Sequence, residues 1–137
     1  MDWNDCKQKK LAKKITSDPE LIKSLIHSST NKNASQKTLA LTEITAVSKV
    51  SLAYDAVREK LEALAVKNGW KIYNHECYCS FLKEIIKESE LADMFDLLRK
   101  VRNDLNYYGK SISTADATKR IAELETVLKK VGKLLEK

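Results

Sequence analysis

The sequence predicts an all-α protein, an antiparallel up-and-down helical bundle of four to five main helices. The 137 residues contain one proline and three glycines, too few for a turn-rich sheet. Apolar residues recur at intervals of three and four over most of the chain, the spacing of one helix face. No stretch alternates apolar and polar residues as a strand does. We expect one domain over residues 1–137, with a basic N-terminal helix in 1–17 and the bundle in 18–137.

Two helices are predicted in the N-terminal third. Residues 4–16 place apolar side chains such as Leu11 on one side and lysines on the other. Asp18 and Pro19 then supply the N-cap and the first-turn proline of a second helix. The polar stretch SSTNKNASQK, residues 28–37, has no periodicity and predicts a loop after that helix.

The third helix has the clearest pattern, an apolar seam at the heptad period. Its members are Val47, Val50, Tyr54, Val57, Leu61 and Leu64. Thr42 is expected to cap its start, and Asn68-Gly69 to end it in the left-handed conformation. The apolar residues WKIY, 70–73, read as a connector.

Three cap signals divide the C-terminal half. Asn74 is expected to cap a short helix over residues 75–87. Ser89 opens a longer helix that ends at Gly109. Ser113, followed three residues later by an aspartate, is a variant of the capping box and starts the last helix.

Composition limits the protein classes. No run of about eighteen apolar residues is present, so we expect no membrane segment. No apolar stretch follows the N-terminal lysines, so no signal peptide is expected. Cys6, Cys77 and Cys79 are odd in number and include a C-x-C pair, which predicts free thiols in a cytoplasmic protein. Only two histidines, far apart in the chain, argue against a zinc site.

The net charge of +6 is concentrated near the two ends of the sequence. Residues 1–40 carry eight lysines and four acidic residues, and residues 110–137 carry seven basic and four acidic residues. Such an excess either attracts phosphate backbones or forms a solvated lysine-rich surface. The lysines of residues 7–14 are open to both interpretations, as a guide for RNA or as a solvated face.

Arg102 interrupts the apolar stripe of its helix. It lies four residues after Leu98 and three before Leu105, which places it on the apolar face. A guanidinium there is costly unless it is paired or faces a wet cleft. One interpretation is structural, either a snorkelling arginine or an ion pair with Asp55 or Glu59 of the third helix. The other is a groove where the arginine meets an anion such as phosphate.

The stretch RNDLNYYGK, residues 102–110, gathers hydrogen-bonding side chains around that arginine. They are Asn103, Asn106, Tyr107 and Tyr108. Asn106 lies on nearly the same helix face as Arg102, whereas Tyr107 lies about 140° further round an ideal helix. We therefore expect Arg102 and Tyr107 to converge only if the helix end distorts, which Gly109 permits, or if a second subunit supplies one of them.

The segment RNDLNYYG, at the end of the penultimate long helix, resembles the signature region of HEPN domains (higher eukaryotes and prokaryotes nucleotide-binding). Residues 52–85 resemble the central helical region of compact prokaryotic members, and the resemblance covers roughly residues 20–135. It implies an antiparallel helical bundle that is commonly dimeric. Many members are metal-independent ribonucleases, and others are toxins, companions of minimal nucleotidyltransferases or non-catalytic binding modules.

The family motif is an arginine, a polar residue and, after four to six further residues, a histidine. Arg102 and Asn103 match its first half, and Tyr107 stands where histidine is expected. Tyrosine, with an ordinary pKa near 10, can donate a proton but is a poor base at neutral pH. Binding therefore survives this replacement better than catalysis. His75 can replace the missing base only if its turn reaches Arg102, and otherwise has a local capping role.

Two functional hypotheses follow from the resemblance. The first is an RNA- or nucleotide-directed protein, a toxin-type or degenerate metal-independent ribonuclease with a groove around Arg102. Its catalytic candidates are Arg102, Asn103 and Tyr107, and its binding candidates are Asn106, Tyr108, Asp55 and His75. The second is a non-catalytic nucleotide-binding or assembly module that partners a nucleotidyltransferase-type antitoxin. We expect a cytoplasmic homodimer without cofactor or metal in either case. A third interpretation makes Arg102 a paired structural charge at a dimer seam.

Overall fold

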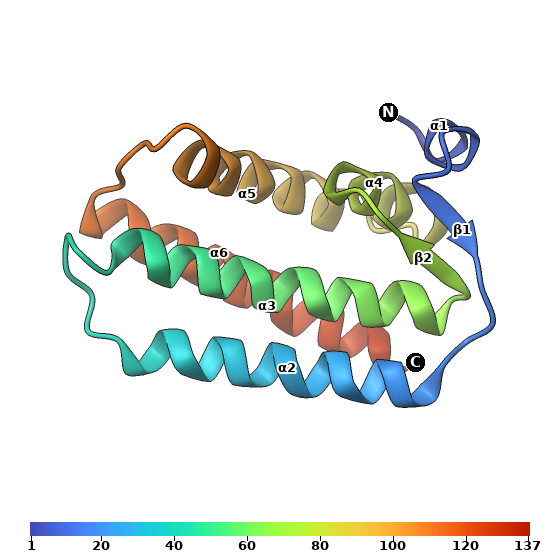
Figure 1. Cartoon of the computed structure of the whole chain (residues 1–137), viewed down its shortest axis with the longest axis horizontal. Coiled ribbons are helices and arrows are strands. Elements are labelled where there is room, and N and C mark those ends of the chain that lie inside the picture. Colours follow the sequence, from blue (N-terminus) through green and yellow to red (C-terminus); the bar gives the residue numbers. More distant parts are fainter.

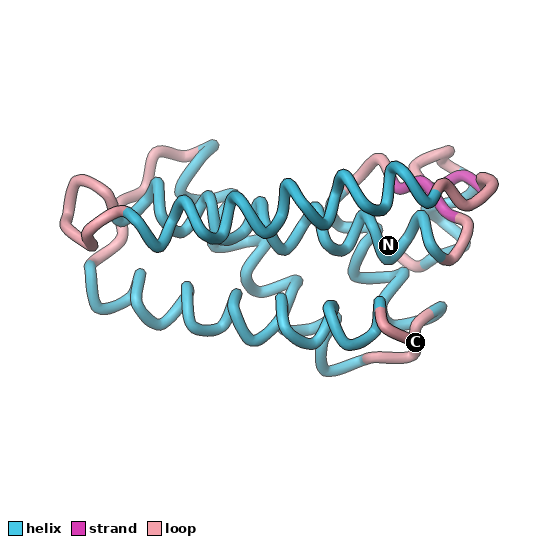
Figure 2. Tube along the Cα trace, turned by 90° about the horizontal axis from the view of Figure 1, so that it is seen from below, coloured by secondary structure: helices cyan, strands magenta, loops and turns pink.

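The computed structural model describes all residues from 1 to 137 and confirms the all-α bundle (Figure 1). Its four long helices are α2 (Pro19–Thr38), α3 (Ala46–Lys67), α5 (Ser89–Tyr107) and α6 (Thr114–Leu135). The short helices are α1 (Trp3–Gln8) and α4 (His75–Ser80), and α4 continues into the π-helical turn η1 (Phe81–Ile85). The connections lie at the two ends of the bundle (Figure 2). No helix combines the length and the apolar character needed to cross a membrane.

Helix α3 forms the centre of the core, as its apolar seam predicts. Val50, Tyr54, Val57, Leu61 and Leu64 are all buried, and alanines on its flanks are buried as well. The small alanine side chains let α2 and α6 approach α3 closely, so three elements share one core. Burial of each large seam residue contributes about 1.5–3 kcal/mol.

The predicted caps at three helix starts are confirmed. Asp18, Asn74 and Ser113 each accept a hydrogen bond from a backbone N–H of the first helical turn, at 2.8–3.1 Å. Gly69 and Gly109 follow α3 and α5 with φ of +83° and +63°. This is the left-handed region, where a side chain would be strained, so both glycines end their helices as predicted.

The predicted loop over residues 28–37 is wrong, because α2 continues unbroken to Thr38. A few polar side chains on this half of the helix, Ser29 and Gln36 among them, are buried against neighbouring helices. The Ser29 hydroxyl is buried and donates to the Ala56 carbonyl of α3 at 2.6 Å. The Lys49 ammonium of α3 donates to the carbonyls of Gln36 and Leu39, the latter at 2.7 Å, and so satisfies the C-terminal end of α2.

The predicted helix over residues 4–16, and with it a basic helix within residues 1–17, is wrong beyond Gln8. The chain turns at Lys10, which has a φ of +60°, and then forms strand β1 (Ala12–Lys14). Strand β1 pairs antiparallel with β2 (Trp70–Ile72), which lies within the stretch predicted as a connector. Strands of three residues are too short to show an alternating pattern.

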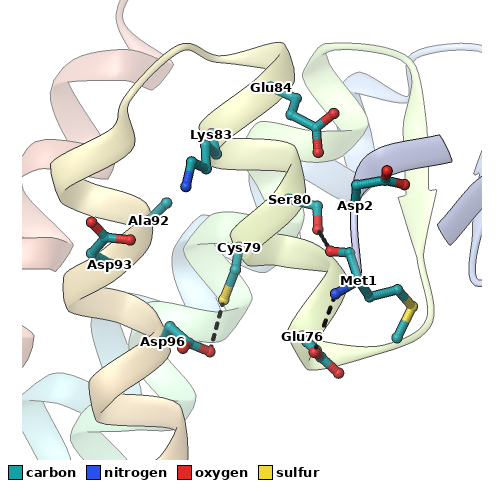
Figure 3. Close-up of a pocket in the computed structure, with 10 residues that line it drawn as sticks. All are labelled: Met1, Asp2, Glu76, Cys79, Ser80, Lys83, Glu84, Ala92, Asp93 and Asp96. Atoms are coloured by element: carbon teal, nitrogen blue, oxygen red, sulfur yellow. Dashed lines mark hydrogen bonds and ion pairs between the residues drawn. The ribbon is translucent and has the colours of Figure 1, made fainter. Parts of the chain in front are cut away.

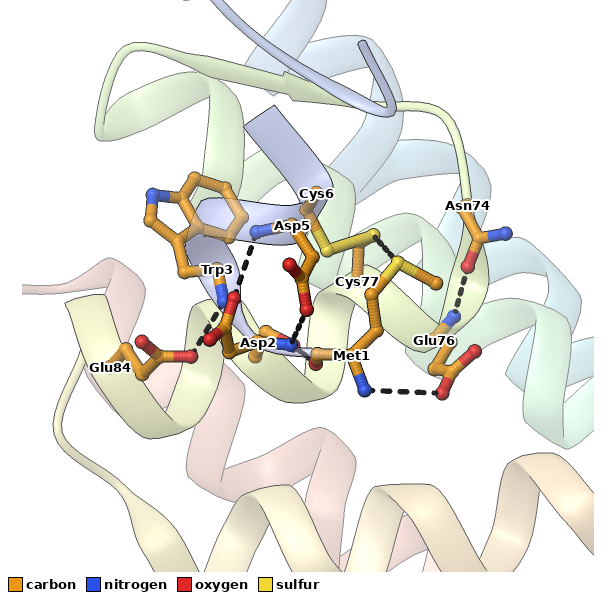
Figure 4. The surroundings of a disulfide bond; sticks show 10 residues. Met1, Asp2, Trp3, Asp5, Cys6, Asn74, Glu76, Cys77 and Glu84 are labelled. Carbon is orange, nitrogen blue, oxygen red and sulfur yellow. Dashed lines mark hydrogen bonds and ion pairs between the residues drawn. A yellow bond between two sulfur atoms is a disulfide. The ribbon is translucent and has the colours of Figure 1, made fainter. Parts of the chain in front are cut away.

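The prediction of free thiols is wrong for two of the three cysteines. Cys6 of α1 and Cys77 of α4 form a disulfide with a Cα–Cα distance of 6.0 Å, and Cys79 stays free (Figure 4). The pairing brings together residues 71 positions apart. It occurs because α1 packs beside α4, where the buried Trp3 ring meets Trp70 edge-on at 5.0 Å. Sequence spacing carries no information on such a long-range contact.

Two further element boundaries differ from their predictions. Helix α3 begins at Ala46 and not at the expected Thr42, because residues 42–45 form a turn. In that turn the Thr42 hydroxyl accepts the Thr45 N–H at 3.2 Å. The helix predicted over residues 75–87 keeps α-helical bonding only to Ser80, after which η1 takes over.

Candidate functional site

The Arg102 side chain lies between α3 and the end of α5, where it is only 16% exposed. Its guanidinium carbon is 5.2 Å from the centre of the Tyr54 ring and 5.6 Å from the centre of the Tyr107 ring. Arginine side chains stack favourably on aromatic faces. The two tyrosines therefore fix the position of the charge that the sequence placed on an apolar helix face.

The polar partners of this guanidinium are few. Its Nη2 lies 3.7 Å from Asp55 Oδ1, and its Nη1 donates to the Tyr107 hydroxyl at 3.3 Å. Its Nε is buried and has no hydrogen-bond partner. The other candidate partner, Glu59, is paired with Lys32 and lies 4.0 Å from Arg58. Asp55 thus balances the charge of Arg102, while part of the hydrogen-bonding capacity of the guanidinium stays unused.

Arg102 and Tyr107 converge within a single chain. Helix α5 keeps its helical bonding through Tyr107, and the left-handed residue Gly109 comes only afterwards. Neither the helix distortion nor the second subunit that the sequence led us to expect is needed. The long Arg102 side chain reaches the Tyr107 hydroxyl despite the offset of about 140° between the two positions on an ideal helix. Tyr107 is the last helical residue and is 69% exposed.

His75 reaches this group through Tyr54. The Tyr54 hydroxyl and His75 Nδ1 are 3.0 Å apart, and the two rings are 5.9 Å apart between their centres. Burial, followed by the positive charges of Arg58 and Arg102, lowers the pKa of His75 from 6.5 to about 4, although Asp55 opposes the effect. The imidazole is therefore neutral at neutral pH. Burial also raises the pKa of Tyr54, so its hydroxyl keeps its proton.

We call Arg102, Tyr107, Asp55, Tyr54 and His75 the Arg102 cluster. Helices α3, α4 and α5 each contribute to it, and four of its five members were predicted as site residues. Tyr54 was predicted only as a seam residue. Its hydroxyl was the available signal, because a buried tyrosine hydroxyl usually finds a hydrogen-bond partner.

The remaining predicted site residues lie at the edge of the cluster or outside it. Asn106 Oδ1 accepts a hydrogen bond from the Ser51 hydroxyl at 3.1 Å and so joins α5 to α3. Asn103 is half-buried and makes no side-chain hydrogen bond within the chain. The Tyr108 side chain is 74% exposed beside the end of α5.

A hollow with a reactive side chain on its wall lies elsewhere, between α4, η1, α5 and the N-terminal residues (Figure 3). It has a volume of about 470 Å³ and is lined mainly by carboxylates, with Cys79 on its wall. Burial and the nearby Asp96 carboxylate raise the pKa of the Cys79 thiol to about 12. A thiol in that state is a poor nucleophile. The Arg102 cluster, in contrast, lines none of the larger hollows, so the groove predicted around Arg102 is not among them. Of its members, Tyr54 is fully buried and Tyr107 is largely exposed.

The chain brings no group of three or more His, Cys, Asp or Glu side chains together in an arrangement that could hold a metal ion. The chemistry that the Arg102 cluster offers is a fixed guanidinium, a neutral imidazole and an accessible phenol. Searches of the sequence against protein-family models and against curated proteins find no match. The likeness of residues 102–109 to the HEPN signature therefore rests on the sequence alone.

Proposed function

We propose that the protein is an RNA- or nucleotide-directed protein of the HEPN type that holds a phosphate at Arg102. The observation that carries this proposal is the guanidinium fixed between two tyrosine rings, with a buried Nε that has no partner. A structural ion pair would be expected to use these donors, because leaving a buried polar group without a partner costs about 1–3 kcal/mol. A phosphate can supply acceptors for the guanidinium N–H groups, and the buried Nε is reached only when the side chains that cover it move.

The surroundings of Arg102 suit a phosphate with a base attached. Among the charges with the largest effect on the pKa of His75, Arg58, Arg102 and Arg99 are positive and Asp55 is negative. Local charge thus favours an anion. The ring of Tyr107, which contacts Arg102, is largely exposed, so an unstacked base can lie against it. Tyr108, the next residue, is exposed as well.

Within this proposal, holding the ligand is better supported than cutting it. Metal-independent cleavage of RNA needs a base for the 2′-hydroxyl and an acid for the leaving oxygen. His75 is neutral and within the cluster, but a pKa of about 4 makes it a weak base at neutral pH. We therefore propose a degenerate ribonuclease site, equivalent to a non-catalytic nucleotide-binding module. A nucleotidyltransferase-type partner and a homodimer are proposed with it on the resemblance alone.

A second candidate function, slow metal-independent ribonuclease activity, is favoured by one observation. Tyr54 links His75 to Arg102, so an imidazole is present near the arginine although Tyr107 occupies the motif position. In that case His75 takes the proton of the 2′-hydroxyl as its oxygen attacks the phosphorus. Arg102 stabilises the developing charge on phosphate, and the Tyr107 hydroxyl donates a proton to the leaving oxygen as its bond to phosphorus breaks.

Nucleotide binding by the wild-type protein and by Arg102→Ala tests the first candidate. Calorimetry with uridine 5′-monophosphate should show at least tenfold weaker binding for the variant, because charge-assisted hydrogen bonds contribute about 1.5–3 kcal/mol. The matched control is Arg120→Ala, which removes an equal charge from α6, where Arg120 pairs with Glu123. Equal affinity of wild type and Arg102→Ala would refute the phosphate site.

Cleavage of an end-labelled RNA in excess EDTA separates the two candidates. If the wild type cuts, and His75→Gln and Tyr107→Phe do not while they still bind nucleotide, the ribonuclease is supported. If the wild type binds without cutting, the binding module is supported. Cutting that is unchanged in His75→Gln and in Arg102→Ala excludes the cluster as the catalytic site.

A further inference from the structure

The outward face of the β1–β2 ribbon carries two lysines directly opposite each other. Ala12 and Ile72 are paired and buried, so the ribbon turns that side toward the core. Side chains alternate between the faces of a strand, so the next pair, Lys13 and Lys71, lies on the opposite side. The pairing extends to Tyr73, whose backbone N–H donates to the Leu11 carbonyl at 2.8 Å. By the same alternation, the Tyr73 side chain lies on the side of Lys71. We call Lys13, Lys71 and Tyr73 the lysine–tyrosine face.

This pairing of like charges is unfavourable for the fold itself. Like charges directly opposite on antiparallel strands destabilise the pair. Neither Lys13 nor Lys71 has a carboxylate within 4.0 Å, since every ion pair in the chain involves other residues. The exposed lysines Lys9 and Lys10 precede the ribbon and add to the charge. The ribbon therefore presents a positive surface that lacks an internal partner.

An exposed aromatic ring lies between these charges. The Tyr73 side chain is 55% exposed, and the ammonium groups of Lys13 and Lys71 lie 5.8 Å and 5.9 Å from the centre of its ring. A ring of this kind offers a surface on which a nucleobase stacks, and flexible lysines beside it reach the phosphates on either side of that base. Duplexes keep their bases stacked inside, so this combination favours a single strand.

The lysine–tyrosine face and the Arg102 cluster are neighbours in the sequence. Tyr73 precedes Asn74, which caps α4, and His75 is the first residue of that helix. Figure 1 shows β2 followed, after a short loop, by α4 at the end of the bundle where β1 and β2 pair. A strand that places one phosphate at Arg102 can thus continue past His75 toward the ribbon.

We propose that the lysine–tyrosine face binds single-stranded nucleic acid, with a base on Tyr73 and phosphates on Lys13 and Lys71. Because the same strand is taken to occupy Arg102, this inference deepens the proposed function and rests on it for the ligand class. It makes the ligand a polymer of several nucleotides, whereas the Arg102 cluster alone needs only one. The two are separable, because a mononucleotide cannot reach both places.

Fluorescence anisotropy with labelled 12-nucleotide oligouridylate tests the face. The double variant Lys13→Gln/Lys71→Gln should bind about tenfold more weakly at low salt, and the slope of log affinity against log salt should shrink by about 1.4, at roughly 0.7 for each lost phosphate contact. Tyr73→Ala should lose at least about fivefold, whereas Tyr73→Phe keeps the ring and the affinity. Oligodeoxythymidylate of the same length should behave alike, because the face contacts phosphate and base.

The matched control is Lys129→Gln/Lys130→Gln, which removes two exposed lysines from α6. If it weakens binding as much as the ribbon variant, binding is a property of net charge and the proposal fails. It also fails if Lys13→Gln/Lys71→Gln binds like wild type, or if a 12-base-pair duplex binds as tightly and Tyr73→Ala changes nothing.

Uridine 5′-monophosphate should bind all ribbon variants equally. If the wild type binds the oligonucleotide but not uridine 5′-monophosphate, the phosphate site at Arg102 is contradicted and the proposal for the lysine–tyrosine face is not.

Discussion

Removing the charge of Arg102 is expected to raise the pKa of His75. The substitution Arg102→Met keeps a long side chain against Tyr54 and Tyr107 but removes the positive charge. Burial is the largest cause of the low pKa of His75, followed by Arg58 and then Arg102, while Asp55 opposes them. Taking away one of the two arginines therefore stabilises the protonated imidazole and leaves the burial effect in place.

The size of this change follows from the geometry of the cluster. The centre of the Tyr54 ring lies 5.9 Å from the centre of the His75 ring and 5.2 Å from the guanidinium carbon of Arg102. Imidazole and guanidinium are therefore at most about 11 Å apart. At that separation an effective dielectric constant of about 20 gives about 1.5 kcal/mol. Because 1.36 kcal/mol corresponds to one pH unit and salt screens a partly exposed pair, we expect the pKa of His75 to rise by about 0.5–1.

An NMR titration of the imidazole resonances measures this directly. The chain has one other histidine, His27 on α2, and His27→Gln removes its signals so that a single imidazole is observed. Arg120→Met serves as the control for a change in net charge far from His75. If the pKa of His75 is the same in Arg102→Met as in its parent, the two groups are not coupled. The Arg102 cluster would then be the wrong description of the site.

Three further predictions concern stability. Because the pKa of His75 falls from 6.5 in the unfolded chain to about 4 on folding, the unfolded chain binds more protons between these values. The contribution of His75 to the free energy of unfolding is therefore complete above pH 6.5 and falls by about 1–2 kcal/mol on acidification to pH 4. This range discounts the full shift of about 3 kcal/mol because the ring is half-exposed. Urea titrations should show a steeper loss of stability in wild type than in His75→Gln, and equal slopes would contradict the shift. Reducing the Cys6–Cys77 disulfide, which closes a 71-residue separation, should lower the free energy of unfolding by up to about 4 kcal/mol, and a melting temperature unchanged by reductant would contradict the cross-link. Lys13→Gln should raise the free energy of unfolding by about 0.2–1 kcal/mol in urea titrations, because it relieves the repulsion from Lys71, and a decrease would indicate a structural role for that lysine.

The long helices were predictable because their signals are local. The α3 seam repeats over six positions, and the caps Asp18, Asn74 and Ser113 lie next to the helices they start. The second half of α2 was missed for the opposite reason. Its polar residues are satisfied by α3, as when Ser29 donates to a carbonyl 27 positions away, and no local pattern reports such a contact.

The site was predictable where one helix carries it and not where several helices meet. Arg102 was identified from its place in the α5 stripe, and Asp55 as one of its two candidate ion-pair partners on the third helix. The role of Tyr54 depends on a hydrogen bond to His75, which comes from a different helix. The lysine–tyrosine face depends on the register of β1 and β2, which places Lys13 opposite Lys71. These two lysines are 58 positions apart in the sequence, so no local pattern indicates that they pair.

The disulfide connects these two regions mechanically. Cys77 lies two residues after His75 and four after Tyr73, and its partner Cys6 holds α1 against α4 next to the ribbon. The start of α4 is therefore fixed on one side by the cross-link and on the other by the bond from Tyr54 to His75. A strand spanning both sites would meet a surface already in position, and such preorganisation reduces the ordering cost of binding. Under reducing conditions the ribbon loses that restraint, so affinity for the oligonucleotide should fall more than affinity for the mononucleotide.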